Sequence, residues 1–186
     1  FGFFPTPAPI VSKLIGAAEI EPGMQCLEPS AGFGAIAEPL AKIVGSDKVR
    51  TCELQADKCQ VLRSKGFKPT QEDFLATSIF RGMQFDRVVM NPPFAKQQDI
   101  DHVREAYWMV RPGGRLVSVM SMGFTFRNDK KATGFRELVD NVDQRGIDRD
   151  TERVAASGRV GQHVAAEAEE ELPIELGGVQ PHTPPE

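Results

Sequence analysis

The sequence has few cysteines and no apolar run long enough to cross a bilayer. Its three cysteines, Cys26, Cys52 and Cys59, form no CxxC pair and are too few and too unevenly spaced for a disulfide framework. Because Cys26 and Cys52 lie in apolar, strand-like stretches, we expect reduced core thiols in a cytoplasmic protein, and no metal site. The start shows no signal-peptide pattern. Since it is Phe1 rather than Met, we expect that the natural N-terminus has been trimmed.

An overall positive charge is also absent. The 186 residues carry a formal net charge of −4, so any binding of nucleic acid would need a local basic surface. From Asp143 onward, ten acidic and four basic side chains give a net charge of −6, which leaves about +2 on the first 142 residues. No aromatic residue follows Phe135, and the end is rich in proline. We therefore expect one domain over 1–142 and an acidic, poorly ordered tail over 143–186, with disorder or a loosely attached helix from residue 165.

Helical and extended patterns alternate along the first 121 residues. The patterns predict helices over 7–18, 35–44, 56–65 and 98–109, and strands over 24–28, 49–53, 68–72, 85–90 and 115–121. Such alternation predicts an α/β fold with a mostly parallel, doubly wound sheet. The segment "RPGGRL" (111–116) predicts a turn before the last of these strands.

The first strand leads into "LEPSAGFGAIAEPL" (27–40), which has the form of a nucleotide-cofactor loop. Gly32 and Gly34 allow a tight turn and the close approach of a ligand to the backbone, although a plain turn would explain them equally well. The next strand ends in Glu53, 19 residues after Gly34, where a carboxylate suits a ribose diol. A surface glutamate is the alternative interpretation of Glu53.

The third strand ends at "EDF" (72–74). Asp73 at this edge could accept a hydrogen bond from an adenine amino group while Phe74 packs on the purine face. A helix cap followed by a core phenylalanine would give the same sequence. Both interpretations stay open from the residues alone.

The fourth strand, "FDRVVM" (85–90), ends abruptly at "NPPF" (91–94). Its nearly continuous apolar run is typical of a strand that is covered on both faces. The two prolines cannot donate ladder hydrogen bonds and they stiffen the chain. A rigid corner therefore presents Asn91 and Phe94 at the carboxyl end of a strand, where open α/β sheets bind their ligands.

In this order and spacing, "EPSAGFG" (28–34), "CEL" (52–54), "EDF" (72–74) and "NPPF" (91–94) resemble the S-adenosylmethionine-dependent amino-methyltransferases. The opening "FFPTPAPIVSKLI" (3–15) resembles the segment that closes over the cofactor in the DNA adenine-N6 methyltransferases. The resemblance covers residues 3–138 and implies a Rossmann-like class I methyltransferase fold, with S-adenosylmethionine as cofactor and DNA as substrate. From the lack of a long apolar run we expect no membrane partner.

The resemblance assigns roles to individual residues. It implies that Glu28 faces the methionine or ribose end of the cofactor, that Glu53 binds the ribose hydroxyls, and that Asp73 and Phe74 hold the adenine. The complete set of implied cofactor contacts is Phe4, Thr6, Pro7, Glu28, Ser30, Gly32, Gly34, Glu53, Leu54, Asp73 and Phe74. The implied catalytic motif is Asn91, Pro92, Pro93 and Phe94. There, Asn91 and the Pro92 carbonyl accept hydrogen bonds from the target amine, and Phe94 stacks on its ring.

Basic residues near the motif offer a possible contact with phosphates. They are Lys96, Arg127, Lys130, Lys131 and Arg136; a solvated surface is the alternative. His102 is expected to be a surface or helix-face residue without a catalytic role, and Tyr107 and Trp108 are expected to pack.

The chain departs from the family in two respects. Members usually end in an antiparallel hairpin, but 145–166 has no strand-like run, so we expect the hairpin to be missing or altered and the strand over 115–121 to be an exposed edge. We also find no target-recognition domain, which predicts low specificity, a partner that supplies recognition, or a substrate that needs no duplex reading. Methylation of an RNA base or a protein glutamine, and a non-catalytic binding module, stay open as alternatives.

Overall fold

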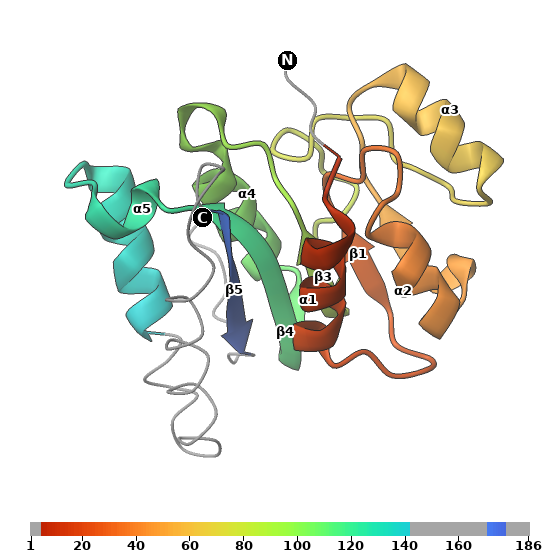
Figure 1. Ribbon diagram of the computed structural model, residues 1–186, viewed down its shortest axis with the longest axis horizontal. Coiled ribbons are helices and arrows are strands. Elements are labelled where there is room, and N and C mark those ends of the chain that lie inside the picture. The colour runs from red at the N-terminus through yellow and green to blue at the C-terminus, as the bar shows by residue number, and fades with distance from the viewer. Residues whose placement is uncertain (1–4, 142–170, 178–186) are drawn as a thin grey trace.

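A computed structural model describes residues 5–141 and 171–177, and Figure 1 shows its arrangement of helices around one sheet. The principal helices are α1 (Ala8–Ala18), α2 (Ala37–Val44), α3 (Ala56–Ser64), α4 (Gln98–Tyr107), the short α5 (Gly123–Phe126) and a helix over 130–141. Two 3₁₀ turns, η1 (Ser46–Lys48) and η2 (Ala95–Gln97), precede β2 and α4. The strands are β1 (Cys26–Glu28), β2 (Val49–Thr51), β3 (Phe85–Met90), β4 (Val110–Ser121) and β5 (Glu171–Gly177).

The sheet confirms the predicted α/β class. Its strand order is β2-β1-β3-β4-β5, and the first four strands run parallel. After β1 the chain passes outward to β2 and then returns to place β3 on the other side of β1. The reversal makes the gap between β1 and β3 the switch point of the topology, which is where open α/β sheets bind ligands.

The strands are covered on both faces, as their continuous apolar runs predicted. Val88 and Met90 of β3 belong to one buried cluster, together with residues of α4 and of the helix over 130–141. Val89 belongs to a second cluster, which contains residues of α1, α2 and α3. Neighbouring residues of a strand therefore face opposite cores, as the alternation of side chains requires. In Figure 1, α1 lies in front of the sheet and α4 behind it.

A buried arginine fastens α1 to the sheet. Arg87 of β3 is 8% exposed and donates from its guanidinium to the carbonyls of Ala18 and Glu19, where α1 ends. Arg115 of β4 donates to the carbonyl of Ala17 at 2.9 Å. These cations satisfy the last carbonyls of the helix, which have no partner within it, and they lie at the negative end of its dipole.

Three expectations for local structure are wrong. The predicted strand over 68–72 is reduced to a single bridge between Thr70 and Cys52. The predicted turn over 111–116 lies inside β4: Val110 pairs with Phe85 and Arg115 pairs with Arg87, so four residues bulge out of the ladder at the glycines.

The third error concerns the tail. Residues 171–177 form β5. All seven of them pair antiparallel with the part of β4 from Arg115 to Ser121. In "ELPIELG", the large aliphatic residues Leu172, Ile174 and Leu176 recur at every second position, a two-residue period that the acidic composition of the tail obscured. The expectations of a tail without strands and of β4 as an exposed edge are therefore wrong here. The segment over 145–166 lies outside the described residues, and so does Phe4.

Candidate functional site

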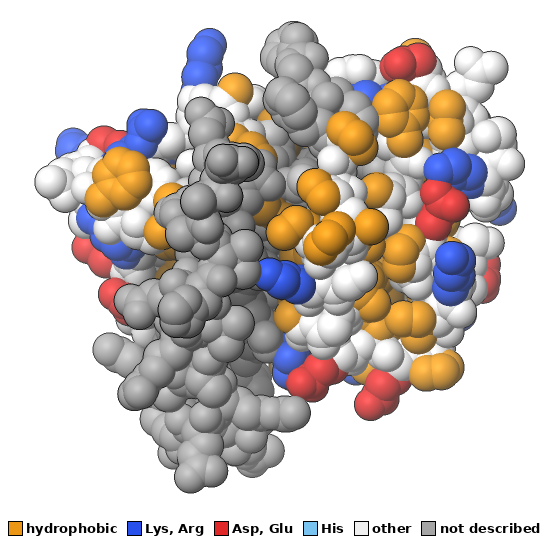
Figure 2. Space-filling view, in the orientation of Figure 1, with side chains coloured by type: hydrophobic (Ala, Val, Ile, Leu, Met, Phe, Trp, Pro, Cys, Tyr) orange, Lys and Arg blue, Asp and Glu red, His pale blue; other side chains and the backbone are white. Residues whose placement is uncertain are grey.

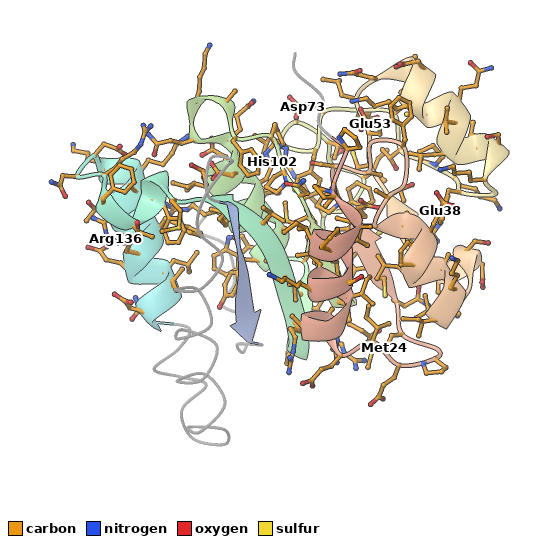
Figure 3. All side chains as sticks on the ribbon, in the orientation of Figure 1. Met24, Glu38, Glu53, Asp73, His102 and Arg136 are labelled. Atoms are coloured by element: carbon orange, nitrogen blue, oxygen red, sulfur yellow. The ribbon has the colours of Figure 1, made fainter. Side chains whose placement is uncertain are left out.

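The predicted site residues follow the carboxyl ends of neighbouring strands. Glu53 follows β2, Glu28 ends β1 and Asn91 follows β3. Because these strands are parallel and adjacent in the order β2-β1-β3, the three side chains lie along one edge of the sheet. Figure 3 shows Glu53 and Asp73 at this edge and Met24 at the opposite one.

The glycine loop between β1 and α2 is held in a left-handed conformation at two positions. Gly32 has φ of +53° and Gly34 has φ of +89°, values that favour glycine. A Cβ on Gly34 would lie 3.1 Å from the side chain of Leu62 in α3. Gly34 is therefore needed for its backbone angle and for the close approach of Leu62, and the amide of Gly32 donates a hydrogen bond to Glu53.

Glu53 organises this loop. Its Oε2 accepts a hydrogen bond from the amide of Gly32 at 2.8 Å, and its Oε1 accepts one from the amide of Gln55 at 2.8 Å. The residue is 8% exposed. Since each carboxylate oxygen has two lone pairs, Glu53 retains acceptor capacity for two more donors, which a ribose diol would supply.

Glu28 is a buried carboxyl group with an unpartnered oxygen. The residue is 2% exposed, and Oε2 has no hydrogen-bond partner. Burial raises the pKa of Glu28 well above its usual range, and the charge of Glu53 adds to the rise, whereas the amide of Ala37 opposes it. The protein therefore holds a neutral or readily protonated carboxyl group between the glycine loop and the motif at β3.

Asn91 connects the motif to the N-terminal segment. Its Nδ2 donates to Thr6 Oγ1 at 3.0 Å, whereas its Oδ1 is buried without a partner. The amide is thus fixed through its nitrogen, and its oxygen remains an acceptor. This contact brings together two motifs 85 residues apart in the chain.

A hollow of about 180 Å³ lies beside the motif. Phe94 and Phe124 give it apolar walls, and its full lining is Phe94, Lys96, Gln97, Asp99, Ile100, Ser121, Gly123, Phe124 and Arg127. The sequence did not single out Gln97 and Asp99, although the polar run "AKQQD" directly after the motif was the available signal. Lys96 and Gln97 both have positive φ, at 55° and 59°, which is uncommon for residues other than glycine.

The proposed adenine contacts have mixed environments. Asp73 is exposed, and its Oδ1 accepts a hydrogen bond from the amide of Leu75 at 3.0 Å, a local turn contact. Phe74 is 3% exposed and packs against Phe80 and His102, with ring centroids 6.2 and 5.6 Å apart. Little of its ring is left for a purine. Leu54, in contrast, is 61% exposed directly after Glu53 and offers an apolar surface there.

His102 is buried rather than on the surface. It is 5% exposed, and its Nδ1 lies 2.9 Å from the carbonyl of Gln98. Burial lowers its pKa, which favours the neutral ring. The three cysteines are free and buried, which was predicted for Cys26 and Cys52, and burial raises the pKa of these two thiols to about 12.

The five basic residues near the motif divide into two groups. Arg136 donates to the carbonyls of Phe124 and Arg127, and Lys131 pairs with Asp101, so both are occupied by internal contacts. Lys96, Arg127 and Lys130 are exposed, and within 5–141 none of these three forms an ion pair.

The described residues contain neither a metal-binding group nor a membrane-spanning helix. No group of three His, Cys, Asp or Glu side chains in that part of the chain could hold a metal ion. No helix there has both the length and the apolarity needed to span a membrane.

Comparison with known sequences identifies one family. The family model described as "Methyltransferase small domain" matches residues 14–144. No curated protein is similar enough in sequence to match.

Several solved structures share the fold. An rRNA methylase from Streptococcus thermophilus is 14% identical with a TM-score of 0.62, and the match covers 94% of this chain and 99% of that one. The EcoKI M protein of a type I restriction enzyme is 16% identical with a TM-score of 0.60, over 72% and 37% of the two chains. An RNA methyltransferase from Salinibacter ruber, solved with S-adenosyl-L-homocysteine, is 19% identical with a TM-score of 0.53, over 68% and 84%.

The chain is shorter than some of these relatives. It spans 37% of the Thermus thermophilus TrmN chain, which it matches at 23% identity, and 50% of a Thermotoga maritima O-methyltransferase, which it matches at 15%.

Proposed function

This chain belongs to the methyltransferase small domain family, and we propose that it transfers a methyl group to the exocyclic amino group (N6) of adenine in DNA. S-adenosylmethionine is the cofactor, in agreement with the family and with the relative solved with S-adenosyl-L-homocysteine. The N-terminal segment with Thr6 and the intact motif at Asn91 support an amine as the methyl acceptor.

The residues at the β1 and β2 ends fit the cofactor. Glu53 has free acceptor capacity for the ribose hydroxyls, and the exposed Leu54 next to it offers an apolar surface for the adenine. Glu28 contributes an unpartnered oxygen at the end of β1 that suits the donors of the methionine part. We keep Asp73 and Phe74 as proposed adenine contacts, with the backbone of the segment rather than the buried ring facing the ligand.

The motif at the end of β3 is suited to an aromatic amine, whose lone pair is delocalised into its ring. Asn91 Oδ1 and the carbonyl of Pro92 accept the two amino hydrogens and favour a tetrahedral nitrogen, so that the lone pair can attack the methyl carbon. Bound S-adenosylmethionine supplies an electrophilic methyl group whose bond to sulfur breaks as the bond to nitrogen forms. The methylated amine then loses one proton to water. Positioning and fixed dipoles therefore carry the catalysis, with no strong base.

The single observation that carries this proposal is the state of Asn91. Its Oδ1 is buried without a partner, while its Nδ2 is held by Thr6 at 3.0 Å. A buried acceptor without a donor is costly, which favours a ligand that supplies the missing hydrogen. Phe94, in the wall of the neighbouring hollow, would stack on the ring that bears this amine. A base in duplex DNA must be flipped out to reach it.

The proposal is tested by transfer of labelled methyl groups from S-adenosylmethionine to separate pools of DNA, RNA and protein. The product is then hydrolysed and its nucleosides and amino acids are identified. We expect label in N6-methyladenine from DNA. Label in an RNA base or in glutamine would replace the proposed substrate, and transfer to none of the pools would favour a non-catalytic module.

A further inference from the structure

An exposed aromatic ring lies at the rim of the hollow. Phe126 is 70% exposed, the most exposed large apolar side chain among residues 5–141. It occupies the last position of α5, next to Arg127 and two residues after Phe124, both of which line the hollow. Over the α5 region, Figure 2 shows an exposed apolar side chain with both basic and acidic side chains around it. A ring so exposed makes little contribution to the core.

The segment that carries Phe126 is fixed by contacts on both sides. Arg136 donates to the carbonyls of Phe124 and Arg127 at 2.6 and 2.7 Å, and Figure 3 shows it beneath α5. Phe124 packs edge-on against Phe135, with ring centroids 5.3 Å apart. Phe126 is thus held outward by a rigid turn, which reduces the entropy lost when a ligand stacks on it.

Two exposed cations line the hollow, and a third lies three residues after Arg127. Lys96 and Arg127 line the hollow, and Lys130 begins the next helix; none has an ion pair within the described residues. The neighbouring Asp129 accepts hydrogen bonds from the amides of Lys131 and Ala132 and from Gln97, so its carboxylate serves local structure. Cations beside an exposed ring suit a chain of phosphates that carries flat bases.

We propose that Phe126 stacks on a base next to the target nucleotide of an unpaired strand, while Lys96, Arg127 and Lys130 contact the adjacent phosphates. This inference rests on the proposed function and names its substrate class as a single strand of nucleic acid. Unpaired bases expose faces that a ring can stack on, whereas the bases of a duplex cover one another. A strand that presents its adenine directly needs no major-groove reading.

A double-mutant cycle tests the stacking contact. Fluorescent single strands with one adenine are titrated into the full chain with S-adenosyl-L-homocysteine, and a second set carries an abasic site on either side of that adenine. We expect Phe126→Ala and one abasic substitution each to weaken binding about fivefold or more. Combined, they should weaken it no further than either does alone, because both remove the same contact.

Matched variants separate the site from the general surface. Trp108→Ala removes an aromatic residue that is 52% exposed at the opposite edge of the sheet, and it should leave affinity unchanged. Arg127→Ala should lower the slope of log affinity against log salt by about 0.7, whereas Arg50→Ala, on the exposed face of β2, should not. DNA and RNA strands of the same sequence distinguish the two sources of the strand.

Several results would overturn the inference. These are unchanged affinity in Phe126→Ala, additive losses in the cycle, tighter binding of a duplex than of a single strand, and methylation of a glutamine peptide with no strand binding. If DNA is methylated while Phe126→Ala has no effect, this inference alone fails. If Phe126 and the neighbouring base are coupled but no pool accepts methyl groups, the proposed function alone fails.

Discussion

Replacement of Asn91 by alanine is the most direct test of the catalytic motif. Asn91 Oδ1 is a buried acceptor without a hydrogen-bond partner, so its loss would break no hydrogen bond within the described residues. Loss of one preorganised polar group from an active site costs about 10²- to 10³-fold in rate, or about 2.7–4 kcal/mol. Because the Pro92 carbonyl would still accept one amino hydrogen, we expect the lower end, a loss of about 100-fold in Asn91→Ala.

Thr6 provides a graded version of the same test. It accepts the hydrogen bond that fixes Asn91 Nδ2, at 3.0 Å, without reaching the amine itself. Thr6→Val removes that acceptor, and a net contribution of about 0.5–1.5 kcal/mol predicts a rate loss of about 2- to 12-fold. Thr6→Ser keeps the hydroxyl and should transfer methyl groups at nearly the parent rate.

The assay is single-turnover methyl transfer with saturating cofactor, alongside the affinities for cofactor and for substrate. If Asn91 acts mainly in the transition state, Asn91→Ala should lose rate while both affinities change little. Phe94→Ala should show the opposite division, with the loss mainly in substrate affinity. An Asn91→Ala protein that transferred methyl groups within a few-fold of the parent rate would refute the mechanism.

Three further predictions concern the cofactor loop and the fold. Glu53→Gln should lower the affinity for S-adenosylmethionine by roughly 10- to 150-fold in calorimetry, since a charge-assisted hydrogen bond contributes about 1.5–3 kcal/mol. The control Glu38→Gln, on α2, should leave this affinity unchanged. Glu28→Gln should gain stability over the parent between about pH 5 and pH 8: burial raises the pKa of Glu28, so the folded chain retains a proton that the unfolded chain releases, and parent stability falls as pH rises. Urea midpoints at both pH values test it, and an advantage that shrinks with pH would contradict it. Arg87→Met should lower the free energy of unfolding by at least about 2 kcal/mol because it leaves the Ala18 and Glu19 carbonyls without their donor, with Arg50→Met as the control.

The sequence predicted the parts of the fold that depend on local pattern. The apolar run ending at Met90 indicated a strand buried on both faces, and Val88 and Val89 indeed lie in opposite cores. It also predicted functional roles for Asn91 and Thr6, and these two side chains form a hydrogen bond with each other. The apolar periodicity of a segment predicts its burial. The order of the motifs predicts their proximity, because neighbouring parallel strands have their carboxyl ends at the same edge of the sheet.

Features that depend on tertiary contacts could not be predicted from local sequence patterns. That Gly34 faces Leu62 follows from where α3 packs, and no local pattern encodes this approach. Phe74 sits against Phe80 and His102 because α4 covers that side of the sheet. In both cases the residue type was compatible with a ligand contact and with packing, and only the surrounding elements decide between the two.

The carboxylate of Glu53 connects local pattern with tertiary structure. As a candidate ligand for ribose it needs free lone pairs, yet it already receives one amide from the glycine loop and another from the start of α3. Because one amide lies directly after β1 and the other lies between β2 and α3, the same side chain that would bind the cofactor also fixes the glycine loop against the start of α3. Cofactor affinity and loop geometry are therefore coupled through one residue. Glu53→Gln keeps the side-chain volume, but its NH2 group would face the amide of Gly32 or that of Gln55, so a loss of cofactor affinity in this variant includes a change in the loop.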